Sequence, residues 1–253
     1  MFNNSENFNA YSRYYDLLYK DKNYTSEANY VIQLIKANHN NATQILELGC
    51  GTGNHAVILC KEKYTVTGLE RSAEMVNLAK QKQIEGFNPM VADITNFSLN
   101  TKFDVAISLF HVISYLTNNE QLVECLNTVN NHLNEKGIFI FDVWYTPAVY
   151  MQKPETRVKR ISDDAIQGTR IAESTIHFNK NVVDVNYEIH IQNKQNGITE
   201  IHNEVHPMRH FSIPEIALLA ELTNFRVIKT EEFGTQETPS ENTWGVCFVL
   251  QKK

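Results

Sequence analysis

The sequence has no long apolar segment, and this absence narrows the class of protein. No run of apolar residues approaches the roughly 18 that a membrane-spanning helix needs. The first residues, MFNNSENFNAYSRYYDLL, lack the basic stretch followed by an apolar run that marks a secretory signal. We therefore expect a protein without a membrane partner that stays in the cytoplasm.

Cysteine and basic residues are also scarce. The four cysteines, Cys50, Cys60, Cys125 and Cys247, form no CxxC pair and have no histidine nearby at metal-ligand spacing. They predict reduced thiols and no metal site. The net charge of -6 disfavours nucleic acid as a partner, because neutralising phosphates needs clustered Lys and Arg. The one short basic cluster, Arg157 to Arg160, is interpreted as a solvated strand edge, with contact to a phosphorylated substrate as the alternative.

Short apolar runs alternate with helical patterns through the first 145 residues. Such alternation predicts an α/β fold with a mostly parallel sheet and helices on both faces. The predicted strands are 44–48, 64–69, 89–92, 103–109 and 137–143, and the predicted helices are 27–37, 55–61, 73–83 and 121–133.

The pattern changes after Pro147. Residues 171–178, 182–191 and 198–205 alternate apolar and polar side chains and are separated by turn residues, which predicts a three-stranded antiparallel β insertion. A helix over 214–223, with Ser212 as its N-cap, and two antiparallel last strands, 225–230 and 246–250, follow. The predicted domains are an N-terminal helical cap (1–43), a core (44–156), the insertion (157–209) as a lid or dimer interface, and the completion of the core sheet (210–253).

A glycine-rich turn follows the first predicted strand. The segment from Glu47 to Gly53 has glycine at Gly49, Gly51 and Gly53, and glycine lets a backbone approach a ligand where a Cβ would clash. The helix that begins there favours an anionic group, such as a carboxylate. The alternative is a turn that merely closes a strand–helix unit.

Two further acidic residues end the next predicted strands. Glu70 lies 17 residues after Gly53, close to the offset at which an acid reaches ribose hydroxyls. Asp93 ends the third strand, where an acid can accept from an adenine amino group, although alone it would more often cap a helix or turn. A nucleoside ligand is favoured. A dinucleotide ligand is disfavoured for two reasons. Its sequence motif has glycine at the position of Asn54, and its pyrophosphate usually requires a second mononucleotide-binding unit, which this sequence does not clearly offer.

These residues together resemble the class I methyltransferases that use S-adenosylmethionine (SAM), over Gln44 to Tyr145. Within that superfamily, the segments 14–19, 109–116 and 141–147 and the β-rich insertion are similar to nucleotide-linked amino-sugar N-methyltransferases and related small-molecule enzymes. The resemblance implies a Rossmann-like methyltransferase sheet, SAM as cofactor and S-adenosylhomocysteine as product.

The resemblance also implies roles for single residues. The methionine part is held by Glu47 and the glycines, the ribose by Glu70, and the adenine by Asp93, Ile94 and Met75. Tyr15 and Tyr19 close over the cofactor. The full cofactor-binding set is Tyr15, Tyr19, Glu47, Gly49, Cys50, Gly51, Gly53, Glu70, Met75, Asp93, Ile94 and Leu109.

Polar residues after the fourth and fifth strands are candidates for acting on the acceptor. An attacking amine must be neutral, and a carboxylate, phenol or imidazole beside it can orient it and accept a proton. His111, Tyr115 and Asp142 are the predicted catalytic residues, and the resemblance implies that Tyr115 and Asp142 face the substrate. The alternatives are a satisfied loop histidine at His111 and an ordinary turn acid at Asp142.

Tyr14, Trp144 and Arg209 are the predicted substrate-binding residues. The two aromatic rings either stack on a base or complete the core. Arg209 either pairs with a diphosphate or carboxylate, or forms a surface salt bridge. Four histidines in the insertion are interpreted as exposed strand residues without a metal, namely His177, His190, His202 and His206.

The predicted function is transfer of a methyl group from SAM to a small molecule, best the amine of a nucleotide-linked amino sugar. Methylation of an oxygen or carboxylate is the first alternative, because acceptor choice lies outside the sheet core. A non-catalytic SAM-binding protein is another. The exposed strands of the insertion allow a homodimer.

Overall fold

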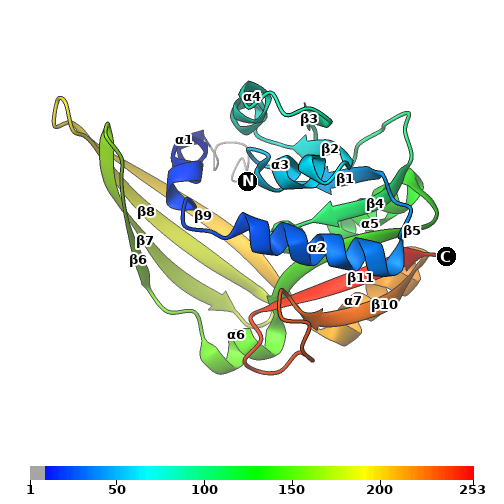
Figure 1. Cartoon of the computed structure of the whole chain (residues 1–253). Helices are drawn as coiled ribbons and strands as arrows, with labels where there is room; N and C mark the ends of the chain where they lie inside the picture. Colours follow the sequence, from blue (N-terminus) through cyan, green and yellow to red (C-terminus); the bar gives the residue numbers. More distant parts are fainter. Residues whose placement is uncertain (1–8) are drawn as a thin grey trace.

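The chain folds as the Rossmann-like α/β unit expected from its sequence (Figure 1). This computed structural model describes residues 9–253, so the first part of the predicted cap, residues 1–8, lies outside the described residues. The helices are α1 (Asn9–Leu18), α2 (Tyr24–Asn38), α3 (Asn54–Lys61), α4 (Ala73–Gln81), η1 (Val112–Tyr115), α5 (Asn119–His132), α6 (Thr146–Gln152) and α7 (Ile213–Leu222). The short α6 was not predicted.

The core sheet has the strand order β3-β2-β1-β4-β5, and these neighbours pair in parallel. Its strands are β1 (Gln44–Leu48), β2 (Thr65–Glu70), β3 (Phe87–Val91), β4 (Phe103–Ser108) and β5 (Leu133–Tyr145). Beyond β5 lie β11 (Gly245–Lys252) and β10 (Phe225–Glu232). β11 is antiparallel to β5, and β10 and β11 form an antiparallel pair as predicted. The strand order reverses between β1 and β4, which is where ligands bind in open α/β sheets.

Alternate residues of the strands feed two separate hydrophobic cores. Leu46 and Phe139 belong to a cluster that contains buried residues of α5 and α7. Their neighbours Ile45 and Ile138 belong to a second cluster with residues of α2 and α3. Because both faces of the sheet are buried, the strands read as continuous apolar runs in the sequence. Because these strands are parallel, their carboxyl ends lie at one edge of the sheet.

The insertion has four antiparallel strands, which corrects the expected three. They are β6 (Arg157–Ser162), β7 (Ile166–His177), β8 (Val182–Asn193) and β9 (Thr199–Phe211), in the order β9-β8-β7-β6. The additional strand β6 was missed because it carries the basic cluster and buries only Ile161. β9 joins the core by pairing with the end of β5, at Trp144 with His210 and Tyr145 with Phe211. The long strands extend away from the core beside α1 (Figure 1).

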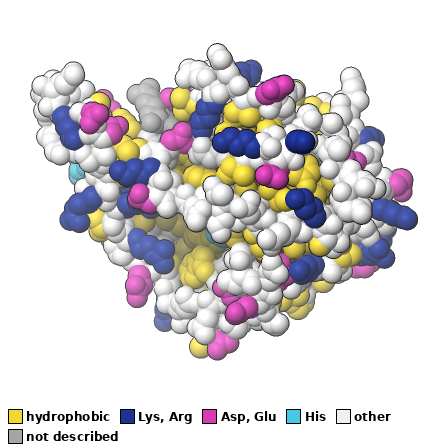
Figure 2. Space-filling view, in the orientation of Figure 1, with side chains coloured by type: hydrophobic (Ala, Val, Ile, Leu, Met, Phe, Trp, Pro, Cys, Tyr) yellow, Lys and Arg dark blue, Asp and Glu magenta, His cyan; other side chains and the backbone are white. Residues whose placement is uncertain are grey.

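The described surface is mixed in charge on the face shown in Figure 2. Lys and Arg side chains are interspersed there with Asp and Glu, and hydrophobic side chains gather in the hollow between the insertion and the core. None of the helices described in residues 9–253 is long and apolar enough to cross a membrane.

Candidate active site

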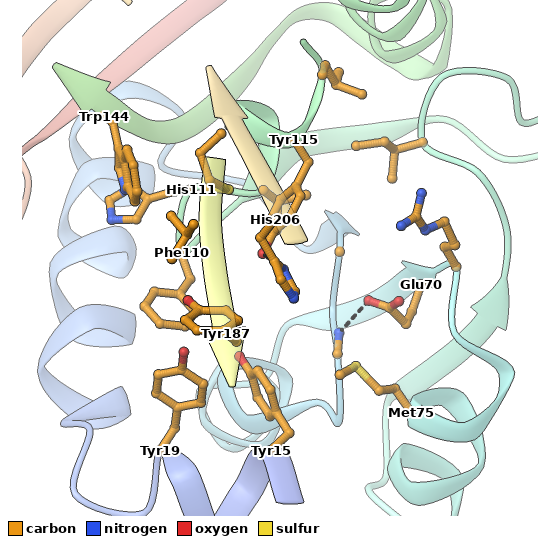
Figure 3. Close-up of a pocket in the computed structure, with 18 of the residues that line it drawn as sticks. Tyr15, Tyr19, Glu70, Met75, Phe110, His111, Tyr115, Trp144, Tyr187 and His206 are labelled. Carbon is orange, nitrogen blue, oxygen red and sulfur yellow. Dashed lines mark hydrogen bonds between the residues drawn. The ribbon is translucent and has the colours of Figure 1, made fainter. Parts of the chain in front are cut away.

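A cavity of about 460 Å³ lies where the carboxyl ends of the core strands meet the insertion and α1. Figure 3 shows how side chains from these three regions point into it. The structure brings many of the predicted residues to its wall, namely Tyr15, Tyr19, Gly49, Gly51, Glu70, Met75, Asp93, Ile94, His111, Tyr115 and Trp144. These eleven residues, predicted for the cofactor or for the acceptor, therefore share one cavity.

The glycine turn presents bare backbone to this cavity at Gly51. Its φ is +55°, and a Cβ built on it would have no described heavy atom nearer than Met75 Sδ at 4.0 Å. A Cβ on Gly49 would instead approach both methyl groups of Val112 to 2.6 Å. The space in front of Gly51 is thus a cradle that a side chain would fill, as expected for the backbone of a cofactor-binding turn.

Carboxylates follow β2 and β3 at the same wall. Glu70 Oε2 accepts from the Gly51 backbone N–H at 3.2 Å, and its Oε1 accepts from Ser72 N–H at 2.8 Å. Burial raises the pKa of Glu70, although these backbone hydrogen bonds oppose the shift. Asp93 Oδ1 accepts from the backbone N–H of Thr95 at 2.8 Å. Asp93 therefore shapes a turn and also lines the cavity.

Two other predicted cofactor residues line a smaller cavity next to the first. Cys50 and Leu109 border a space of about 40 Å³, which Gly49 and Gly51 also line. Tyr24, which the sequence analysis did not single out, lines this space as well. Gly53 is the N-cap residue of α3, and a Cβ there would lie 2.6 Å from the Phe87 ring. Gly53 is absent from the described lining of both cavities.

Glu47 lies buried in β1 and is not among the described residues that line either cavity. Its Oε1 lies 3.9 Å from His55 Nδ1, and its Oε2 has no hydrogen-bond partner among the described residues. Burial, with the charge of Glu70 as a second cause, raises the pKa of Glu47 from its ordinary 4.5 to about 8.

Glu47→Gln is expected to reduce the loss of stability that occurs as pH rises from 4.5 to about 8. Because the folded-state pKa is raised, the stability that Glu47 contributes is complete below pH 4.5 and is lost as pH rises towards 8. Relative to Glu47→Gln, the wild type should lose at least about 1 kcal/mol between these limits, or about 2–4 °C in Tm. Thermal unfolding without SAM measures this difference. Parallel pH dependence of the two proteins would contradict it.

Partly exposed His111, which follows β4, pairs with buried Asp142 near the end of β5. His111 Nδ1 lies 2.6 Å from Asp142 Oδ2, and the His111 backbone N–H donates to Asp142 Oδ1 at 3.3 Å. Burial alone would raise the pKa of Asp142, but His111 brings it below its ordinary range. Asp142 is 2% exposed and lies behind His111. This corrects the expectation that Asp142 faces the substrate: His111 lines the cavity instead.

The backbone that carries His111 is strained. Phe110 and His111 have φ values of +65° and +61° in succession. Non-glycine residues rarely adopt this conformation, and strained residues cluster at functional sites. The turn aims His111 at the cavity and places Phe110 5.0 Å from the Tyr19 ring.

Aromatic and basic residues of the insertion complete the wall. Tyr187, Arg170 and Arg157 line the cavity, and the Arg170 guanidinium lies 4.8 Å from the centre of the Tyr187 ring. Its Nη1 also donates to Tyr19 Oη at 3.2 Å. No local pattern singles out Arg170 or Tyr187, because one polar residue in an alternating strand resembles any exposed residue.

His206 corrects another expectation. It was interpreted as an exposed strand residue, but it is 2% exposed and lines the cavity. Glu204, two residues earlier and on the same face of β9, supplies the acceptor that a buried histidine needs. Glu200 and His202 have the same spacing at exposed positions, so this pattern alone does not single out His206.

Two predicted substrate residues do not reach the cavity. Arg209 pairs with Glu215 at 2.5 Å and donates to Asn119 Oδ1 at 2.8 Å, which matches its alternative interpretation as a salt bridge. Tyr14 packs against the buried residues shared by α1 and the insertion. In residues 9–253, no group of three or more His, Cys, Asp or Glu side chains is placed to hold a metal ion.

Comparisons with known proteins agree with this geometry. Residues 45–137 match the methyltransferase domain family. A dTDP-3-amino-3,4,6-trideoxy-alpha-D-glucopyranose N,N-dimethyltransferase of Streptomyces venezuelae is 30% identical over 54% of this chain and 58% of its own length. A putative methyltransferase of Geobacillus sp. is 25% identical over 97% of this chain and 99% of its own.

A solved structure shares the whole fold. The SAM-bound amino pentose methyltransferase CalS10 of Micromonospora echinaspora superposes with a TM-score of 0.77 at 20% identity, over 97% of this chain and 98% of that one. The first relative is thus matched over little more than half its length, whereas the fold is shared from end to end. Residues 45–137 are thus similar to a methyltransferase domain, and the Rossmann-like fold of the whole chain is shared with a SAM-bound methyltransferase.

Proposed function

We propose that the protein transfers the methyl group of SAM to the amine of a nucleotide-linked amino sugar. This proposal rests on one observation: side chains suited to bind SAM and side chains suited to bind an amino-sugar acceptor line the same cavity. One wall has the glycine turn with Glu70 and Asp93, and the other has His111 and the basic, aromatic residues of the insertion. The relative that methylates a dTDP-linked amino sugar supports the same acceptor class.

The cofactor half follows from the fit of the wall to SAM. SAM supplies a methyl group activated on a sulfonium. The Gly51 backbone admits its close approach, Glu70 is positioned for the ribose hydroxyls, and Asp93 with Ile94 for the adenine. Met75 packs on the purine. The smaller space at Gly49, Cys50 and Leu109 takes the methionine part, with Tyr15 and Tyr19 closing over it.

The acceptor half lies at His111 and Tyr115. Asp142 occupies the Nδ1 side of His111, so the Nε2 side remains to orient the amine or to take up its proton. Trp144 and Tyr187 offer ring surfaces for a base or sugar, and Arg157 and Arg170 offer guanidinium groups for a diphosphate. Methyl transfer needs alignment above all, and the side chains on this wall supply contacts that align the acceptor.

An acceptor panel tests the proposal. We expect a dTDP-linked amino sugar to be methylated at nitrogen, with kcat/KM about 100-fold or more above the same sugar without its nucleotide, because the guanidinium contacts are lost. A dTDP-sugar with hydroxyl in place of the amine is the matched control and should not react. Mass spectrometry of the products gives the answer. Methylation of hydroxy acids or phenols, with the dTDP-linked amine untouched, would refute it.

The expected domain division is retained as part of the proposal, with the insertion acting as the lid of the acceptor side. Among residues 9–253, β6 pairs with β7 alone, and its other edge could pair with a second copy of the chain. Homodimerisation, the absence of a nucleic-acid partner and a cytoplasmic location stay predictions.

A further inference from the structure

Three polar side chains form a continuous chain from the insertion into the cavity. Tyr115 Oη lies 2.9 Å from His206 Nδ1, and His206 Nε2 lies 3.0 Å from Glu204 Oε2. The His206 and Glu204 side chains are 2% and 5% exposed. Figure 3 shows Tyr115 and His206 side by side at the cavity. Tyr115 and His206 both line it, whereas Glu204 lies behind them.

The order of acid, imidazole and hydroxyl sets the direction of the hydrogen bonds. An ionised carboxylate only accepts, so His206 carries its proton on Nε2 and donates it to Glu204. Nδ1 is then a lone pair that accepts from the Tyr115 hydroxyl. A base held by a carboxylate and bonded to a hydroxyl is the arrangement by which enzymes draw a proton from that hydroxyl.

Building on the proposed amine methylation, we propose that Tyr115, His206 and Glu204 form a proton relay that removes a proton from the acceptor nitrogen. In the transfer, the amine lone pair forms the bond to the methyl carbon, and the carbon–sulfur bond breaks with its electron pair left on sulfur. The resulting ammonium gives one proton to Tyr115 Oη as the phenol proton passes to His206 Nδ1. Tyr115 ends neutral, His206 ends as an imidazolium paired with Glu204, and water takes up the proton before the next cycle.

The surroundings of the relay favour concerted transfer over a stored charge. Burial holds the pKa of Tyr115 well above its ordinary value, with Tyr187 and Tyr19 as further causes, so a free phenolate is disfavoured. The centre of the Tyr187 ring lies 4.8 Å from that of the His206 ring. The Arg170 guanidinium also contacts the Tyr187 ring. Besides these, Arg71 acts on Tyr115 electrostatically. Tyr115 therefore accepts the proton of the ammonium only as its phenol proton moves to His206.

The same strand contains a matched control. Glu200 and His202 repeat the spacing of Glu204 and His206 four residues earlier, with His202 Nε2 3.2 Å from Glu200 Oε2. This second pair is 56% and 29% exposed and is absent from the described cavity wall. The two pairs share chemistry and strand geometry but differ in access to the cavity.

The kinetic test compares the pH dependence of kcat in Tyr115→Phe, His206→Gln and Glu204→Gln with Glu200→Gln and His202→Gln. We expect the three relay variants to lose about 10–100-fold near neutral pH and to regain activity as pH rises, because hydroxide replaces the relay. SAM affinity, measured by calorimetry, should stay within about twofold and reports that each variant is folded. The control variants should follow the wild-type profile. Relay variants with an unchanged pH profile would overturn the proposal.

Nitrogen-15 NMR of His206 gives a readout that needs no acceptor. The relay requires the Nε2–H tautomer in wild type, with the Nδ1 signal shifted in Tyr115→Phe, where its hydroxyl partner is removed. An Nδ1–H tautomer would overturn the relay. If the wild type methylates hydroxyl acceptors alone, the proposed amine function fails while the tautomer still decides the relay, so the two failures are distinguishable.

Discussion

Gly51→Ala should weaken SAM binding by at least about 100-fold, equivalent to about 2.8 kcal/mol. Two physical effects combine at this position. The left-handed φ of +55° strains any residue with a Cβ, and the added methyl enters the space in front of the turn. The strain lowers the stability of the folded protein by roughly 1–2 kcal/mol, whereas the loss of SAM affinity comes from the methyl group, which removes the close approach that the cofactor requires. Isothermal titration of SAM into the purified variant measures the loss.

Gly197→Ala is the matched control. Gly197 lies in the turn between β8 and β9 with a φ of +72°, and a Cβ there would meet no described atom within 4 Å. This variant should share the backbone strain, and therefore a similar decrease in Tm, but should bind SAM like the wild type. If Gly51→Ala bound SAM as tightly as Gly197→Ala, the glycine turn would not be the cofactor cradle.

Loss of the His111 and Asp142 pair should impair turnover far more than cofactor binding. His111→Gln is expected to lower kcat by about 100-fold or more, because it removes the imidazole that faces the acceptor. Asp142→Asn should lower kcat by a smaller factor, about 10-fold or more, because a neutral amide holds the ring less firmly and no longer favours one tautomer. Steady-state kinetics with the methylated acceptor, together with SAM calorimetry, separates these effects.

A second histidine–acid pair controls for the substitutions themselves. His177 Nε2 lies 2.8 Å from Asp184 Oδ2 in the insertion, and both residues are absent from the described cavity wall. His177→Gln and Asp184→Asn should therefore keep wild-type turnover. Wild-type kcat in His111→Gln with every active acceptor would remove His111 from the chemistry and leave alignment by the cavity wall as the source of catalysis.

Local patterns were sufficient to predict the cofactor side of the fold. The first strand was predicted at 44–48 and is observed there, because its apolar run and the following glycines are contiguous in sequence. The N-cap at Ser212 was likewise recognisable, and its side chain accepts from the Glu215 backbone N–H. Glu70 and Asp93 reach the same wall because parallel strands end at the same edge.

The acceptor side was predicted less well, since it depends on contacts between distant segments. Asp142 was expected to face the substrate, yet it lies behind His111, which belongs to a different strand end. His206 was expected to be exposed, yet β8 and Tyr115 cover it. The side of a strand that is buried depends on what packs against it, and alternation alone does not name that partner.

The amino-acid sequence by itself determined the order of the core strands and of the helices between them, the glycine turn and the acids at the strand tips, because hydrophobic periodicity and backbone requirements act within a few residues. Only the tertiary structure decided that His111 is backed by Asp142, that Arg209 is engaged by Glu215, and that the insertion brings His206 to the cavity. Those outcomes follow from packing between elements far apart in the chain, where the free energy of burying a polar group depends on the partner that it meets.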